Sequence, residues 1–233
     1  CRCMYIYDFF NTVPFSPVCF FFFHLLLHVA SREILEQDRI MAVLRQIPEE
    51  YLVPLADLLV EGGVRSLEIT HDYERTTDDV AMLSKRFGLD ASVGVGTTWS
   101  VEQAESAAAA GAEFCVIPGV DIATSQRSAE LGMLTLPGVQ TPAEIQTALR
   151  AGADVLKFFP AEPPGAAWLA QVVPAYSKRP FMATGGVTVE NMADFYAAGA
   201  IAVGMANSLF GDFRELDRAP SLIAAAVAVA RNH

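Results

Sequence analysis

The sequence is poor in positive charge. Lys and Arg together number 16 against 27 Asp and Glu, and the formal net charge is -11. Proteins that bind nucleic acid draw much of their affinity from Lys and Arg that neutralise phosphates. The composition therefore argues against nucleic acid as a partner, although one local basic pocket could still hold a small anionic substrate.

Cysteine is also scarce, with four in 233 residues. Cys1, Cys3 and Cys19 lie in the first twenty residues, and Cys115 alone falls in the patterned part of the chain. This spacing excludes a disulfide framework and fits a reducing, cytoplasmic location. Cys1 and Cys3 have no matching pair of Cys or His nearby at ligand spacing, so we expect no metal site.

Long apolar runs are missing as well. The run Val18–Ala30 has only about 13 residues, which is too short to span a bilayer. It has the length of a signal-peptide core, with Ala30-Ser31 as a cleavage site, but Arg2 is the one positive charge before it and Asp8 cancels that charge. We expect residues 1–32 to be an apolar N-terminal extension outside the fold, with a signal peptide or membrane anchor as the alternative, and residues 33–233 to form one domain.

After this segment, short apolar runs alternate with helical patterns, and 52% of the chain is hydrophobic. Strands are expected at 39–45, 64–70, 91–96, 114–118, 134–136, 155–159, 180–184 and 200–203. Helices are expected at 48–61, 77–87, 100–111, 123–131, 141–151, 165–174, 188–198 and 221–231. Eight such units predict a parallel sheet closed into a single-domain (β/α)8 TIM barrel of the α/β class, with its site where the strands end.

One expected strand carries a lysine in its middle, in Leu156-Lys157-Phe158-Phe159-Pro160. Burial of an ammonium is costly and lowers the pKa of the amine. A neutral amine attacks carbonyl carbon and forms an imine. The alternative is a lysine at the strand end whose head reaches water.

Alternation of side chains along strands predicts which residues face the barrel interior. If Lys157 points inward, the inward set comprises Val155 and Phe159; Met41, Val43 and Arg45; Ser66, Glu68 and Thr70; Val95 and Thr97; and Met182, Thr184 and Gly186. One lysine, one glutamate and one arginine are then expected near one mouth of the barrel.

These three residue types match the needs of imine chemistry. The amine attacks a carbonyl, a carboxyl group moves protons, and an arginine holds a substrate carboxylate with its forked donors. The alternative is that Glu68 and Arg45 form a structural ion pair inside the barrel. The turns at 184–187 and 204–208, after the seventh and eighth strands, are places where barrels bind phosphate through backbone N–H groups.

Six motifs occur together in order: Leu-Glu-Ile-Thr (67–70), Gly-Val-Gly-Thr (94–97), Ile-Pro-Gly (117–119), Leu-Pro-Gly-Val (136–139), Leu-Lys-Phe-Phe-Pro-Ala-Glu (156–162) and Thr-Gly-Gly-Val (184–187). In order and spacing the chain resembles the 2-keto-3-deoxy-6-phosphogluconate / 4-hydroxy-2-oxoglutarate aldolases over roughly residues 35–232. The resemblance implies a metal-independent class I aldolase on a (β/α)8 barrel, without an organic cofactor, and a homotrimer.

The resemblance also implies the roles of individual residues. Lys157 would be the Schiff-base lysine and Glu68 the general acid/base. The pyruvate portion of the substrate would be held by Arg45 and Thr97 and lined by Pro118 and Phe159. The distal, often phosphorylated, end would lie at Thr184, Gly185, Gly186 and Asn207.

Two positions depart from the family pattern. Asp72 stands where many relatives have an arginine, so carboxylate binding would fall on Arg45, and an aspartate there would repel an anionic substrate. Asn207 stands where the last loop has a phosphate-contacting serine, which puts the phosphorylated substrate in doubt. His71, next to Asp72, has no counterpart in the family pattern and is interpreted as a loop residue.

The expected function is cleavage of a 2-keto-3-deoxy-(phospho)sugar acid or 4-hydroxy-2-oxo acid to pyruvate and an aldehyde. One alternative is another pyruvate-imine enzyme such as a decarboxylase, or a sugar-phosphate isomerase. A second is a barrel that binds a keto acid without turnover. In each case the expected partner is a small keto acid, with no membrane and no nucleic acid.

Overall fold

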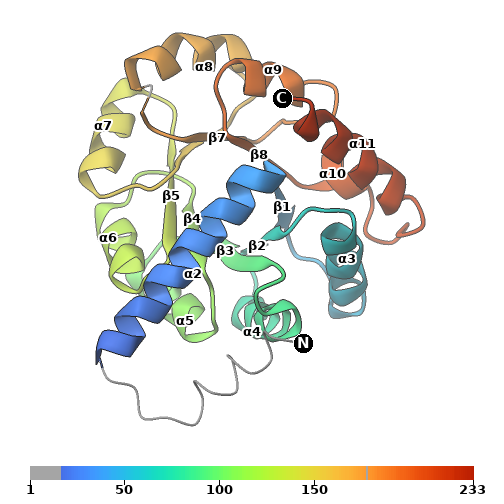
Figure 1. Cartoon of the computed structure of the whole chain (residues 1–233), viewed down its shortest axis with the longest axis horizontal. Coiled ribbons are helices and arrows are strands. Elements are labelled where there is room, and N and C mark those ends of the chain that lie inside the picture. The colour runs from blue at the N-terminus through green and yellow to red at the C-terminus, as the bar shows by residue number, and fades with distance from the viewer. Residues whose placement is uncertain (1–16, 177) are drawn as a thin grey trace.

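The computed structural model describes residues 17–176 and 178–233, with side chains from residue 28 onward. Eight parallel strands close into a barrel, with β1 paired to both β2 and β8. Helices surround the barrel on the outside (Figure 1). The predicted (β/α)8 TIM barrel is confirmed.

The strands are β1 (Ile40–Leu44), β2 (Ser66–Thr70), β3 (Ser92–Gly96), β4 (Phe114–Ile117), β5 (Leu134–Val139), β6 (Leu156–Phe158), β7 (Phe181–Thr184) and β8 (Ala202–Met205). The helices are α2 (Pro17–Asp38), α3 (Glu49–Glu61), α4 (Thr76–Phe87), α5 (Val101–Ala109), α6 (Ile122–Glu130), α7 (Pro142–Arg150), α8 (Ala166–Val172), the 3-10 helix η1 (Val173–Tyr176), α9 (Met192–Ala197), α10 (Asn207–Phe210) and α11 (Ala219–Arg231). All eight strands lie where they were predicted, whereas α2 and α10 were not predicted.

Local sequence signals explain several helix ends. The Thr141 hydroxyl accepts from the Glu144 N–H, and the Glu144 carboxylate accepts from the Thr141 N–H, which is a capping box. Beyond the C-caps of α5, α7 and α9, Gly111, Gly152 and Gly199 have φ of 95°, 90° and 100°. Glycine adopts this conformation without a Cβ penalty, so the repeated Ala-Gly-Ala pattern ends a helix and leads into the next strand.

The predicted start of α9 was wrong. Residues 188–191 were expected to open the helix, but it begins at Met192. The Asn191 side-chain oxygen accepts from the Thr188 N–H at 2.8 Å, and its amide donates to the Gly186 carbonyl at 3.0 Å. These side-chain hydrogen bonds stabilise a turn at residues 188–191, so the helix begins after it.

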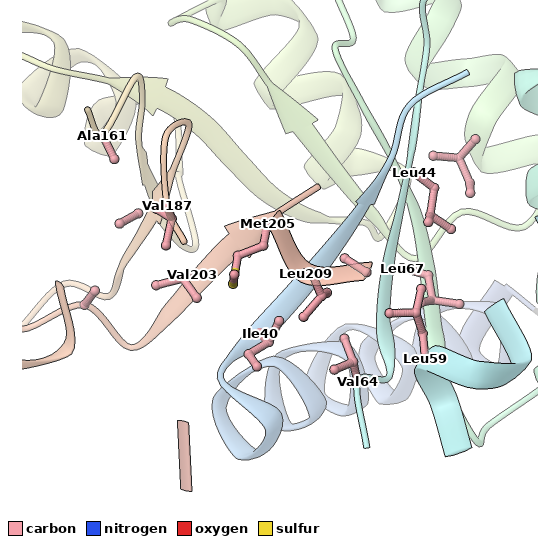
Figure 2. Close-up of a cluster of buried hydrophobic side chains, with 14 of the residues drawn as sticks. Ile40, Leu44, Leu59, Val64, Leu67, Ala161, Val187, Val203, Met205 and Leu209 are labelled. Carbon is pink, nitrogen blue, oxygen red and sulfur yellow. The ribbon is translucent and has the colours of Figure 1, made fainter. Parts of the chain in front are cut away.

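The hydrophobic core has two layers, as strand alternation requires. An outer layer fills the space between strands and helices, and Figure 2 shows part of it, with Ile40, Leu44 and Leu67 among the labelled residues. An inner layer fills the barrel with Met41, Phe114, Val116, Leu134, Leu136, Val155, Met182 and Ala202, joined by Leu35 of α2. The barrel is therefore a packed core, and its open chemistry is restricted to its ends.

Helix α2 lies across the end of the barrel where the strands begin (Figure 1). Leu35 is buried in the inner layer. The Ser31 hydroxyl donates to the Glu113 carboxylate at 2.6 Å, and His28 lies 3.3 Å from Asp154. Glu113 immediately precedes β4, and Asp154 lies two residues before β6. These contacts are therefore at the end of the barrel where the strands begin.

The predicted domain boundary at residue 32 stays a prediction, and α2 runs across it. The part of the extension at residues 1–16, with Cys1 and Cys3, lies outside the described residues. Within the described part, no helix combines the length and apolarity needed to cross a bilayer.

Candidate active site

Lys157 points into the barrel. Its neighbours in β6, Leu156 and Phe158, belong to the outer layer, while Val155 belongs to the inner layer. The Lys157 side chain is only 5% exposed, and its Nζ lies 4.5 Å from the centre of the Phe159 ring. The alternative of a lysine head that reaches water does not fit this burial.

The pKa of Lys157 is lowered from the usual value of a lysine. Burial is the main cause, and the positive charge of Arg45 adds to it, while Glu68 opposes the shift. Neutral amine is thus available nearer to neutral pH than for an exposed lysine. The amine is the nucleophilic form that carbonyl addition requires.

Glu68 projects from β2 into the same interior and is 1% exposed. Its neighbours Leu67 and Ile69 belong to the outer layer, which confirms the predicted alternation in this strand. Within the described residues, the Glu68 Oε2 atom is buried without a hydrogen-bond partner. An orphaned buried carboxyl oxygen is costly in a folded protein and is a frequent mark of a functional site.

The pKa of Glu68 is raised. Burial is the main cause and Asp72 adds to it, whereas the positive charges of Lys157 and Arg45 act against it. A raised pKa brings a carboxyl group closer to the pH range in which it can both donate and accept a proton, as a general acid/base must. The pKa values of Lys157 and Glu68 shift in opposite directions, and each group acts on the pKa of the other inside the barrel.

Glycines on β3 make room for Glu68. A Cβ placed on Gly96 would lie 1.7 Å from Glu68 Oε1, and one on Gly94 would lie 2.4 Å from the Phe114 ring. Both glycines therefore face the barrel interior, and only glycine fits beside the carboxyl group. The sequence signal for this role was available, because a glycine inside an apolar strand often marks a close approach of another group.

The predicted inward direction of Val95 was wrong. Val95 belongs to the outer layer, because the inward positions of β3 are Gly94 and Gly96. Thr97 nevertheless reaches the mouth, because its φ of 57° breaks the alternation just after the strand. A β-branched residue with positive φ is a conformational outlier, which points to a constraint at this position.

Arg45 lies at the mouth, next to the end of β1. It pairs with Asp72 through Nη1, and its Nη2 donates to the Thr97 hydroxyl at 3.0 Å. Within the described residues its ion pair is with Asp72 and not with Glu68, so the alternative of a structural Glu68–Arg45 pair does not hold. Arg45 is half exposed and Asp72 is 22% exposed.

The remaining predicted pyruvate-side residues lie at the same end of the barrel. Pro118 and Phe159 are half-buried and follow β4 and β6 directly. Gly138, paired with Lys157 across β5 and β6, would place a Cβ 2.2 Å from the Pro118 carbonyl oxygen. Glycine at position 138 therefore lets Pro118 approach the strand that carries the lysine.

The predicted distal end is formed by the segments after β7 and β8. Thr184 is 7% exposed, and its hydroxyl is buried without a hydrogen-bond partner in the described part. Gly185 and Gly186 have φ of 93° and 79°. Asn207 begins the short helix α10 and is exposed, and the following Ser208 hydroxyl donates to the Val187 carbonyl at 2.7 Å, which ties the two segments together.

Two other features of the described residues bear on the site. A cavity of about 420 Å³ lies between the segment after β6 and α9, lined by Glu162, Gly165, Asn191 and Asp194 among others. Lys157 and Glu68 do not line it, so its size does not make it the reaction centre.

The described residues include no group of three or more His, Cys, Asp or Glu side chains that could hold a metal ion. His71, between Thr70 and Asp72, is half-buried, and its Nδ1 atom is buried without a hydrogen-bond partner among the described residues.

Comparison with known proteins matches this chain to one family of aldolases. Residues 31–219 match the family model described as KDPG and KHG aldolase. A 2-dehydro-3-deoxy-phosphogluconate aldolase of Treponema pallidum is 36% identical over 166 residues, covering 71% of this chain and 79% of that protein.

Solved structures agree with that match. The 2-keto-3-deoxy-6-phosphogluconate aldolase of Zymomonas mobilis ZM4, solved with 3-phosphoglycerate, superposes with a TM-score of 0.77 at 26% identity and covers 85% of this chain and 95% of that one. A cube-shaped protein cage, designed by fusing symmetric oligomeric domains, superposes with a TM-score of 0.80 at 28% identity and covers 83% of this chain and 72% of that one.

Proposed function

The chain belongs to the KDPG and KHG aldolase family, and from this premise we propose that it is a class I aldolase that cleaves a 2-keto-3-deoxy acid to pyruvate and an aldehyde. The observation that carries the proposal is a pair of buried groups, Lys157 at 5% and Glu68 at 1% exposure, inside one barrel. Their pKa values are shifted toward the neutral amine and the neutral acid. That is the state in which carbonyl addition can begin.

The proposed reaction starts at Lys157. Its Nζ attacks the C2 carbonyl carbon of the substrate, and the carbonyl oxygen takes one proton from the amine nitrogen and one from the Glu68 carboxyl group. That oxygen leaves the carbinolamine as water, which gives a protonated imine on Lys157 and leaves Glu68 as a carboxylate. Glu68 then takes the proton of the C4 hydroxyl, and the C3–C4 bond breaks. The electrons of that bond pass to the imine nitrogen, which leaves an enamine and a free aldehyde.

Glu68 also closes the cycle. It returns its proton to C3 of the enamine, and water then hydrolyses the protonated imine. This step releases pyruvate, restores the neutral Lys157 amine and returns one proton to the Glu68 carboxylate. A carboxyl group of raised pKa suits both steps, because it must be a base for the hydroxyl and an acid for the enamine carbon. No metal and no organic cofactor takes part in these steps.

The substrate would lie across the mouth from β1–β3 to β7–β8. Its carboxylate would bind to Arg45 and Thr97, with Pro118 and Phe159 against the methylene carbons. Its distal end would lie at Thr184, Gly185, Gly186 and Asn207. The Thr184 hydroxyl has no hydrogen-bond partner in the part of the chain that the structure describes, which supports a polar ligand there, either a phosphate or a hydroxyl group.

A cleavage assay on paired substrates tests this proposal. Release of pyruvate from 2-keto-3-deoxy-6-phosphogluconate and from its unphosphorylated counterpart is measured with the wild type and with Lys157→Met. We expect turnover of at least one substrate by the wild type and none by the variant. Equal turnover by both proteins would exclude the lysine mechanism, and carbon dioxide in place of an aldehyde would indicate a decarboxylase.

We further propose a homotrimer in the cytoplasm. Support for an oligomer comes from the similarity to a cage built from symmetric oligomeric domains and from two large apolar side chains, Trp99 and Ile122, which are 64% and 48% exposed. The buried free thiol of Cys115 fits a reducing compartment. Light scattering after gel filtration should give the mass of three 25.2 kDa chains, and a monomer would contradict the trimer.

A further inference from the structure

Four polar side chains from three neighbouring strands form a continuous chain at the mouth. The Thr70 hydroxyl donates to Asp72 Oδ1 at 2.8 Å, Asp72 Oδ2 pairs with Arg45 Nη1, and Arg45 Nη2 donates to the Thr97 hydroxyl at 3.0 Å. Thr70 is fully buried, so it anchors the chain to β2. Both oxygens of Asp72 are therefore engaged, and its carboxylate has a fixed orientation.

The orientation of Arg45 follows from its two partners. A guanidinium carries five N–H donors in a rigid plane. Asp72 and Thr97 each accept one of them, on different terminal nitrogens, and this fixes both the position and the rotation of the plane. In the described part of the chain the other donors make no further hydrogen bond, so they are open to an incoming carboxylate.

The conformation of Thr97 shows that the fold maintains this arrangement against a local cost. Its φ of 57° is strained for a β-branched residue, and that conformation brings the hydroxyl to Arg45. A relaxed extended backbone at position 97 would continue the alternation of β3 and direct the side chain differently.

Asp72 also carries a charge that matters for binding. The substrate of the proposed function is an anion, and it would approach a guanidinium that a carboxylate already neutralises. Two carboxylates on one arginine repel each other, although water at a half-exposed site screens the repulsion. Asp72 thus orients the arginine and at the same time weakens its hold on a second anion.

We propose that Asp72 is a positioning residue that fixes Arg45 for the keto-acid carboxylate and competes with that carboxylate, so that the pyruvate product is bound weakly and leaves readily. The proposal rests on the proposed function, because it takes a keto acid as the ligand of Arg45. It adds an orienting role to the repulsion that the sequence predicts for Asp72. The same residue supplies both the geometry and the repulsion.

Two substitutions separate these effects. Asp72→Asn keeps an oxygen acceptor for Arg45 but removes the charge, whereas Asp72→Ala removes both. Asp90→Asn is the matched control, because it changes the net charge equally on an exposed residue just before β3, at the opposite end of the barrel. The affinity for pyruvate is measured by calorimetry, and kcat and KM are measured by the release of pyruvate from a cleavable substrate.

We expect Asp72→Asn to bind pyruvate about fivefold more tightly than the wild type, the order of effect of one partly screened charge. KM should fall with it, while kcat stays level or falls because the product leaves more slowly. Asp72→Ala should bind more weakly than Asp72→Asn, and Asp90→Asn should match the wild type. Equal affinities in the two Asp72 variants, or an affinity in Asp72→Asn no tighter than in Asp90→Asn, would overturn the proposal.

The pH profile gives a readout that a purely structural role would not change. The charged groups that act on Glu68 are Lys157, Arg45 and Asp72, and Asp72 raises the pKa of Glu68. Without its charge the pKa of Glu68 falls, so the limb of the kcat profile that reports Glu68 should move to lower pH in Asp72→Asn and stay in place in Asp90→Asn.

Failure of the proposed function would look different from failure of this inference. If the wild type binds pyruvate in calorimetry but forms no borohydride-stable adduct at Lys157, the imine mechanism is lost. The order of pyruvate affinities among the Asp72 variants would still decide the role of Asp72.

Discussion

Replacing Gly96 by alanine should remove most of the activity. It should also lower the stability of the fold, but by no more than the same replacement at Gly94 in the same strand. The added Cβ would lie 1.7 Å from Glu68 Oε1, 2.3 Å from Cδ and 2.7 Å from Cγ. A rotation of the carboxyl group alone cannot relieve three such contacts, because Cγ is included. The whole Glu68 side chain must therefore move from its position in the barrel interior, where its charge acts on Lys157.

The size of the expected loss follows from the role of Glu68. Proton transfer by a placed acid or base contributes about 100- to 10,000-fold to a rate, and a misplacement of about 1 Å can cost about 100-fold. We expect kcat of Gly96→Ala to fall by at least about 100-fold. Overpacking at a buried site costs about 1–3 kcal/mol, or roughly 2–10 °C in Tm for a chain of this size.

Gly94→Ala provides the control. It adds the same methyl group to the same inward face of β3, but the new Cβ would lie 2.4 Å from the Phe114 ring and 2.5 Å from the Phe114 carbonyl oxygen. Its Tm should fall at least as much as that of Gly96→Ala, because a backbone atom yields less easily than a side chain. The three atoms nearest to this Cβ belong to Phe114 and none to Glu68, so kcat per folded molecule should remain within about threefold of the wild type.

The two variants are compared by kcat from pyruvate release, with the folded fraction measured by circular dichroism. A folded Gly96→Ala protein with wild-type kcat would contradict this prediction, since it would show that the position of Glu68 does not matter for catalysis. An equal loss of kcat in the folded fractions of both variants would refute it as well, because the loss would then be a general effect of packing in β3.

Two further predictions concern the end of the barrel covered by α2. Leu35→Ala should lower the free energy of unfolding by about 2–5 kcal/mol, the usual range for a buried leucine, with kcat unchanged; urea unfolding that shows no loss would mean that α2 does not stabilise the barrel. Burial raises the pKa of Glu113 to about 7, against the hydrogen bond from Ser31. Its contribution to stability is therefore present below the unfolded value of 4.5 and is lost as pH rises through about 7. Glu113→Gln should accordingly raise Tm relative to the wild type at about pH 8 and much less at about pH 5, and equal shifts at both pH values would contradict the assignment.

The central pair of the site could be predicted from the sequence because residue type and strand period decide it. A lysine and a glutamate within apolar strands are unusual enough to stand out, and alternation then fixes their direction. Leu67 and Ile69 face the helices, so Glu68 must face the interior. The same logic failed at Val95, because it took its phase from Thr97, whose positive φ lies outside the regular strand.

Other features depend on tertiary contacts that no local pattern encodes. The pairing of Arg45 with Asp72 joins the segments that follow two different strands, and its geometry is set by Thr70 and Thr97. The docking of α2 was missed because its apolar composition is compatible with an extension outside the fold. What fixes this helix is Leu35 in the barrel interior, and that contact becomes visible only in three dimensions.

Imine formation at Lys157 is tested most directly by reduction of the protein with borohydride in the presence of pyruvate, followed by mass spectrometry of the intact chain and of its peptides. We expect one added reduced pyruvate unit, located on Lys157, at a pH well below the ordinary pKa of 10.5 for a lysine. Lys157→Met should gain no mass. A wild-type protein that stays unmodified, or that carries the adduct on a different lysine, would contradict the claim that the buried amine of Lys157 forms the imine.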